Sequence, residues 1–252
     1  MSEYTPSKDR PSWFSWLHVV GLFTIPALFA LVAMLPFVVH NGYGGPSRQN
    51  RCANSLKQIG IALQTYHDAH HCFPPAYFTD EHGTPTHSWR AILLPYFESE
   101  ELANQYRFDE PWNGPNNRKL LDKAPYPYRC PSDGGNESDT SYLAIVGPDS
   151  MWRGPHPIAI PEMSDGTSKT IAIVECVGSG VNWLEPRDIA FDDAIAGVNR
   201  VTGRPGIRGP HTRGASALFA DGSVHMLEYL IDPSVIRAAL TPAGGESVQF
   251  PD

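Results

Sequence analysis

The longest apolar stretch of the chain lies near its N-terminus, where residues 11–47 contain no Asp, Glu, Lys or Arg. Within this window residues 17–40 are almost entirely apolar, and about 20 such residues suffice for a helix to cross a bilayer core of roughly 30 Å. We therefore predict a transmembrane helix over residues 17–40, preceded by a short cytoplasmic tail over residues 1–16. A cleaved signal peptide is the alternative, but the run is longer than in most signal peptides and no Ala-x-Ala site follows it.

A second, amphipathic pattern covers residues 47–72. Its apolar side chains and one histidine recur at alternating spacings of three and four residues, as on one face of an α-helix. These positions are Cys52, Leu56, Ile59, Leu63, Tyr66 and His70. Ser47 is a suitable N-cap, and Phe73-Pro-Pro75 ends the pattern because proline cannot continue a helix. We expect this helix to pack its apolar face on a sheet.

Short β-like segments dominate the rest of the chain. Residues 142–147 and 169–177 are apolar runs of strand length, and residues 215–227 contain Asp221-Gly222 between two apolar runs, which is a strong hairpin signal. A two-residue loop there would pair Phe219 with Val224. One long helix followed by several strands favours an α+β fold with an antiparallel sheet over an alternating α/β fold.

The charge of the chain limits its partners. The formal net charge is −8, and the first 47 residues are neutral, so the whole excess lies on residues 47–252. This segment has the size of one ordinary domain. An acidic domain is repelled by phosphate, so we expect no nucleic-acid partner. Because a long domain after a span is translocated largely regardless of charge, we expect residues 47–252 outside the cytoplasm and a single-pass protein in the inner (cytoplasmic) membrane.

Four cysteines, Cys52, Cys72, Cys130 and Cys176, lie in this domain. An even number of cysteines in an exported domain suggests two disulfides. A helix over residues 47–72 would separate Cys52 from Cys72 by about 30 Å, and bridged Cα atoms lie within about 7 Å. Two pairing schemes remain open, one joining Cys52 to Cys130 and the other joining Cys52 to Cys176. Free buried thiols are the alternative to both.

Several short strings resemble, in their order, one family: the planctomycete-type prepilin-like proteins with a C-terminal signature of His, nine residues and Asp-Gly. In this chain the signature is His211 with Asp221 and Gly222. The resemblance covers nearly all of residues 48–245. The other strings are Arg51-Cys-Ala-Asn-Ser-Leu-Lys-Gln-Ile-Gly60, Tyr66-His67-Asp68, Phe73-Pro-Pro75, Ser88-Trp-Arg90, Leu94-Pro-Tyr96, Pro115-Asn-Asn117, Cys130-Pro-Ser-Asp133, Ser141-Tyr-Leu143 and Asp165-Gly-Thr-Ser168.

The resemblance implies a pilin-like fold and an association with type II secretion or type IV pilus-like machinery, as a pseudopilin. Prepilins resemble one another in that each has a glutamate shortly after a glycine at the start of the apolar run. Here Pro26 stands at that place, inside the string that begins at Gly21. We therefore expect a static, membrane-anchored member of the family without filament assembly.

The candidate sites of the chain indicate structural roles. If residues 215–220 form a strand, His211 and Asp221 lie at its two ends, about 20 Å apart, so they cannot act together on one atom. Asp221-Gly222 is then turn chemistry, and His211 orders the preceding loop. Two further clusters have weak ligand spacing for a metal: His67, His70 and His71 at a helix end, and Asp188, Asp192 and Asp193 for calcium. We predict no metal, no cofactor and no catalysis.

We expect the protein to act through protein–protein contacts in a secretion or cell-envelope assembly. The alternative is an extracytoplasmic binding module for a sugar or another polar ligand, with Asn113, Asn116 and Asn117 near Trp112 as its candidate residues. A metal-dependent hydrolase would rest on the histidines alone.

Overall fold

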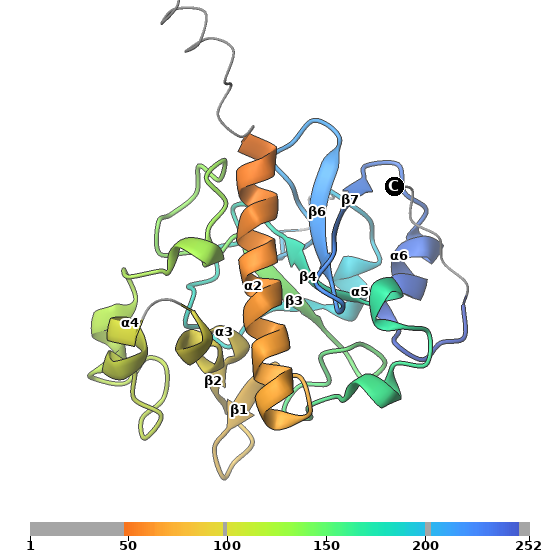
Figure 1. The fold of residues 1–252 in the computed structure, drawn as a ribbon. Coiled ribbons are helices and arrows are strands. Elements are labelled where there is room, and N and C mark those ends of the chain that lie inside the picture. Colours follow the sequence, from red (N-terminus) through yellow and green to blue (C-terminus); the bar gives the residue numbers. More distant parts are fainter. Residues whose placement is uncertain (1–47, 98–99, 200–202, 247–252) are drawn as a thin grey trace, which may run out of the picture. The chain divides into compact units, whose positions relative to one another are not determined.

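The computed structural model describes residues 48–97, 100–199 and 203–246. The predicted tail (1–16) and the predicted transmembrane helix (17–40) lie outside these residues. The described elements follow the chain in a fixed order, and Figure 1 shows the helices and strands along it. They are α2 (Arg48–His70), β1 (Tyr77–Thr79), β2 (Pro85–Ser88), α3 (Trp89–Ile92), η1 (Leu94–Tyr96), α4 (Glu100–Gln105), η2 (Asn117–Leu120), η3 (Tyr126–Tyr128), β3 (Tyr142–Val146), η4 (Ile160–Glu162), η5 (Thr167–Lys169), β4 (Ile171–Glu175), β5 (Ile189–Ala190), α5 (Phe191–Ala194), β6 (Gly214–Phe219), β7 (Val224–Glu228) and α6 (Pro233–Leu240), where η marks a 3-10 turn.

A five-stranded sheet with the order β5-β3-β4-β6-β7 forms the centre of the domain, and β1 and β2 make a separate hairpin. The pairs β3–β4, β4–β6 and β6–β7 are antiparallel, as expected. The edge strand β5 instead pairs parallel to β3, with Ile145 opposite Ile189. The sheet is therefore mixed, which corrects the prediction of a purely antiparallel sheet.

The predicted amphipathic helix is α2, and it lies across one face of this sheet (Figure 1). Of the six positions in the predicted apolar stripe, all but the terminal His70 are buried. Gly60 is a point of close approach, since a Cβ there would lie 2.9 Å from Leu218 Cδ1 on β6. The helix ends two residues before the predicted boundary, because His71 adopts a left-handed φ of 60° as a C-terminal cap.

The opposite face of the sheet is also covered. Ile236, Ala239 and Leu240 of α6 pack there with alternate residues of the strands, including Ala217 and Phe219 of β6. The intervening residue Leu218 belongs to the cluster under α2. Strands β4 and β6 bury every residue for this reason, and the domain has a layer of helix on each side of its sheet.

The β6–β7 hairpin has a different register from the predicted one. Leu218 pairs with Val224, and the amide of Phe219 donates to the carbonyl of Ser223 at 2.8 Å. The loop therefore contains Ala220, Asp221 and Gly222, with Gly222 at a φ of 90°. A three-residue loop of this kind needs a residue with positive φ before the returning strand, and glycine supplies it without strain. The two-residue loop, with Phe219 opposite Val224, was wrong by one residue.

The predicted fold class also requires a correction in its transmembrane helix. Within the residues that the structure describes, no helix is both long and apolar enough to cross a bilayer. The longest described helix, α2, carries Arg48, Arg51, Lys57 and Asp68. The fold that the structure establishes is thus an α+β domain with a mixed sheet, and the transmembrane helix of the predicted fold class has no counterpart in it.

Candidate functional site

The two ends of the predicted signature lie at opposite ends of β6. His211 precedes the strand, and Asp221 and Gly222 form the loop that follows it. The Asp221 carboxylate accepts hydrogen bonds from the backbone amide of Ser223 at 2.9 Å and from its hydroxyl at 2.7 Å. Asp221-Gly222 therefore acts in the turn, as predicted, and His211 belongs to a different site.

The segment before His211 runs beside the end of β4. Its path is fixed by two backbone hydrogen bonds: Arg208 donates to the carbonyl of Glu175, and Val177 donates to the carbonyl of Arg208, both at 2.9 Å. Gly209 permits the tight return, because a Cβ there would lie 2.1 Å from the carbonyl oxygen of Gly214. This path directs the His211 side chain inward, where it is 10% exposed.

Glu175, the last residue of β4, is a functional candidate that was not among the residues predicted from the sequence. Its side chain is fully buried on the face of the sheet that α2 covers. Oε2 accepts a hydrogen bond from the backbone amide of Ser216 at 3.0 Å. Burial raises the pKa of Glu175 to about 7, although the bonds from Ser216 oppose this shift. The sequence feature that could have identified Glu175 is its position as a single carboxylate in the otherwise apolar run 171–177.

A disulfide between Cys52 and Cys130 closes the other side of the site. Cys52 lies in the second turn of α2 and Cys130 in the loop that precedes β3, and both are fully buried. The bridge is one of the two pairings that the sequence left open for Cys52. The second expected disulfide is not formed: Cys176 is buried among side chains on the other face of the sheet, and Cys72 lies beyond the far end of α2.

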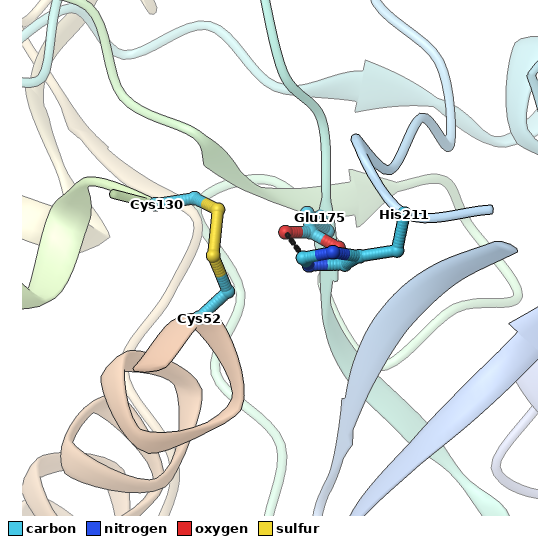
Figure 2. Close-up of side chains that lie close together, drawn as sticks. All are labelled: Cys52, Cys130, Glu175 and His211. Atoms are coloured by element: carbon cyan, nitrogen blue, oxygen red, sulfur yellow. Dashed lines mark ion pairs between the residues drawn. A yellow bond between two sulfur atoms is a disulfide. The ribbon is translucent and has the colours of Figure 1, made fainter. Parts of the chain in front are cut away.

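Figure 2 shows these four side chains pointing toward one another. One potential ligand atom from each of Cys52, Cys130, Glu175 and His211 lies within 4.8 Å of the other three. His211 Nε2 is 3.6 Å from Glu175 Oε1, which is too far for a hydrogen bond. Neither atom has a hydrogen-bond partner among the described residues, although both are enclosed. The site therefore combines a disulfide with two unsatisfied polar atoms.

The acidic cluster considered for calcium is divided by the fold. Asp188 is buried, and its Oδ1 accepts bonds from Arg90 Nη1 at 2.7 Å, Trp89 Nε1 at 3.1 Å and the backbone amide of Ala144 at 2.9 Å. Asp193 lies near Arg204 on the surface, with 3.8 Å between Oδ2 and Nη1. Asp188 is thus a structural carboxylate in the core, which leaves no shared acidic loop.

The histidines at the end of α2 also serve the fold. His70 Nε2 lies 2.7 Å from the Tyr96 hydroxyl and its ring stacks on Tyr66, while the His67 ring packs on Phe73. His71 is the helix cap described above. These histidines do not form a cluster with metal-binding geometry within the described part of the chain.

The residues considered for sugar binding have internal partners. Asn117 is fully buried, and its side chain bonds to the backbone of Arg107, Glu110 and Pro111. The Asn116 amide group donates to Glu110 at 3.1 Å. An open cleft of about 480 Å³ lies beside them instead, with the exposed rings of Phe78 and Phe108 on its wall.

Comparison with known proteins gives one match. Residues 46–149 match a family described as "Protein of unknown function (DUF1559)", a stretch that covers less than half of the chain. It includes Cys52 and Cys130 but neither Glu175 nor His211. No curated protein and no solved structure matches the chain.

Proposed function

We propose that the protein works outside the cytoplasm as a non-catalytic, pilin-like component that acts through protein–protein contacts in a secretion or cell-envelope assembly. The observation that carries the proposal is the Cys52–Cys130 disulfide, which fastens the N-terminal half of a long amphipathic helix to the domain beneath it. The prepilin-like resemblance and the pseudopilin-type association with type II secretion belong to this proposal.

The disulfide supports the compartment. Stable disulfides form in oxidising, extracytoplasmic environments and are rare in the cytosol. Cys52 and Cys130 are separated by 78 residues in sequence, so the bridge closes a long loop and stabilises the domain chiefly by restricting the unfolded chain. The domain is therefore most stable in an oxidising compartment, where the bridge can form.

Two observations support contact rather than catalysis. In the cluster around Glu175, the glutamate and both cysteines are fully buried and the His211 side chain is only 10% exposed, so the cluster presents little surface to an organic substrate. The exposed apolar side chains lie on the surface instead, with Leu230 at 95% and Ile61 at 66% exposure. Burial of either side chain against a partner would remove apolar surface from water, which favours association.

Site-specific photo-cross-linking in intact cells tests this function. A photoreactive residue at Ile61 on α2, and another at Leu230 after β7, should each give discrete adducts whose partner is a secretion or envelope protein. The same residue at the exposed, polar Glu137 is the matched control and should give no such adduct. Adducts only with cytoplasmic proteins, or equal labelling from all three positions, would contradict the proposal.

The sugar-binding alternative rests on the cleft beside Phe78 and Phe108. Two exposed aromatic rings, with Asp80 and Asp109 also in the lining, are suited to stacking and hydrogen bonding with a polar ring. A glycan array with the oxidised protein tests it, followed by titration of any hit with the Phe108→Ala variant. Tyr126→Ala, which removes an exposed ring elsewhere, is the control.

A further inference from the structure

We propose that Cys52, Cys130, Glu175 and His211 form a zinc site when the Cys52–Cys130 disulfide is reduced. The four residues supply two sulfurs, one imidazole nitrogen and one carboxylate oxygen, all of which are zinc ligands. One ligand atom of each already lies within 4.8 Å of the others (Figure 2). The proposal concerns a property of the isolated protein and stands independently of the compartment proposed above.

The strongest support comes from the two enclosed atoms without partners. Glu175 Oε1 and His211 Nε2 have no hydrogen bond among the described residues, although Glu175 is fully buried. Buried polar atoms are almost always satisfied, and an exception calls for a missing partner. Both atoms are aimed at the same small volume, beside the two sulfurs. A metal ion in that volume would satisfy both atoms at once.

The spacing of these atoms fits a tetrahedral ion. With bonds of about 2.0–2.1 Å to nitrogen or oxygen, neighbouring ligand atoms in a tetrahedron lie roughly 3.3–3.5 Å apart. The observed separation of His211 Nε2 and Glu175 Oε1 is 3.6 Å. The two sulfurs must move apart on reduction, since zinc-bound thiolates lie roughly 3.7 Å apart at bond lengths of about 2.3 Å.

The surroundings hold the carboxylate and one cysteine in place. Glu175 Oε2 is fixed by the backbone amide of Ser216 at 3.0 Å, which leaves Oε1 free for a metal. The backbone amide of Cys130 donates to the Ser141 hydroxyl at 3.0 Å, and that hydroxyl donates to Asp133 at 2.7 Å. Such outer contacts orient metal ligands in known sites.

The change between the two states is a balanced exchange. A dithiol reductant transfers two electrons and two protons to the bridge, the Cys52–Cys130 S–S bond breaks, and the reductant closes to its own disulfide. Zn²⁺ then binds both sulfurs, Glu175 Oε1 and His211 Nε2, and it displaces both thiol protons, together with the proton of Glu175 where that carboxyl is protonated, to solvent. The ion compensates the two thiolate charges, which would be costly to bury alone. Disulfide and metal exclude each other, because oxidation uses the sulfur electron pairs that the ion needs.

Titration of the full chain with Co²⁺ tests the site, because cobalt bound to thiolates absorbs in the near ultraviolet and the visible. The protein is reduced with dithiothreitol, freed of reductant by anaerobic gel filtration and titrated beside an oxidised sample. The reduced protein should bind one equivalent of Co²⁺ with thiolate charge-transfer bands, and Zn²⁺ should displace it. The oxidised protein should show no such bands. A reduced protein without thiolate-bound cobalt overturns the proposal.

Two variants separate this site from cysteines and histidines elsewhere. His211→Ala and Glu175→Gln should each weaken Co²⁺ binding by at least about tenfold. Cys72→Ser and His70→Ala remove the same residue types at the far end of α2 and should bind as the wild type does. Equal affinity in all four variants would assign the cobalt to thiols alone and overturn the proposed ligand set.

A measurement on the wild type does not depend on the folding of any variant. Zn²⁺ should slow the air oxidation of reduced Cys52 and Cys130 severalfold, as followed by mass spectrometry of the bridged peptides, because a metal-bound thiolate must be released before it oxidises. Reformation of the disulfide at the same rate with and without Zn²⁺ overturns the proposal.

Discussion

The imidazole of His211 faces the carboxylate of Glu175 across 3.6 Å, in a buried pocket that the Cys52–Cys130 disulfide closes. The two residues come together because the segment before β6 pairs at Arg208 with Cys176, at the end of β4. The segment then turns back on itself, which brings His211 opposite Gly214. The arrangement places a histidine of the predicted signature beside a buried glutamate that lies outside that signature.

Replacement of Glu175 by Gln should change how stability depends on pH. Burial raises the pKa of Glu175 from 4.5 to about 7, so between these values the folded state holds a proton that the unfolded state has released. The free energy of unfolding therefore falls as the pH rises through this window, by at most about 3 kcal/mol. We expect the Glu175→Gln variant to be more stable than the wild type at pH 8. At pH 5 we expect this advantage to be smaller.

The measurement is urea unfolding of the oxidised protein, with a chelator present, at both pH values. Burial lowers the pKa of the facing His211, so this group acts in the opposite sense and lowers stability as the pH falls below 6.5. Glu162→Gln, at an exposed carboxylate, should retain the slope of the wild type between pH 5 and 7. A Glu175→Gln variant with the wild-type slope would show that Glu175 is ionised throughout.

Removal of the disulfide should lower the free energy of unfolding by most of the stabilisation that closing this long loop provides. For a bridge that spans 78 residues, the chain-entropy model gives about 4.5 kcal/mol. We expect the double variant Cys52→Ala with Cys130→Ala to lose about 2–5 kcal/mol in urea unfolding under oxidising conditions. Cys72→Ala, at a half-buried free cysteine, should lose less than about 1 kcal/mol. Equal losses in both proteins would contradict a structural role for the bridge.

The buried ion pair of Arg90 with Asp188 should be more sensitive than a surface pair. Arg90 is enclosed and donates to the backbone carbonyls of Trp183 and Glu185 as well as to Asp188. Asp188→Asn leaves the charge of Arg90 buried without a counterion, so the free energy of unfolding should fall by about 3–5 kcal/mol. Glu228→Gln breaks the exposed pair with Arg213 at 2.9 Å and should change it by less than about 1 kcal/mol. Thermal and urea unfolding of both variants give the comparison.

The loop after β6 predicts a specific effect at Gly222. Its φ of 90° is open to glycine and strained for alanine, so Gly222→Ala should destabilise the domain by about 1–2 kcal/mol. Gly134→Ala is the matched control, because Gly134 is exposed, lacks a positive φ and has open space around it. If both alanine variants unfold at the same urea concentration, the three-residue loop is not the one that the protein forms.

Local patterns in the sequence predicted the helix and the hairpin well. The spacing of Cys52, Leu56, Ile59, Leu63 and Tyr66 identified the buried face of α2, because helical period and burial are both local properties. The hairpin was correct in place but not in register. Ala-Asp-Gly fits a three-residue loop as readily as Asp-Gly fits a two-residue loop, and only the pairing of the strands distinguishes them.

The candidate site required long-range information that the sequence does not carry. Glu175 meets His211 only because the loop around Gly209 returns beside β4, and β5 joins the sheet in parallel after another long connection. The absence of a second disulfide has a simpler cause. Cys176 follows Glu175 directly, so its side chain points to the opposite face of the sheet from Cys52 and Cys130.

The most direct test of the proposed function is the state of the cysteines in intact cells, together with the compartment of the protein. Cells are quenched in acid, free thiols are labelled, disulfides are reduced and labelled with a heavier reagent, and each cysteine peptide is quantified beside compartment markers. We predict that Cys52 and Cys130 carry the heavy label, that Cys72 and Cys176 carry the light label, and that the protein fractionates outside the cytoplasm. Light label on all four cysteines in a cytoplasmic fraction would contradict the account.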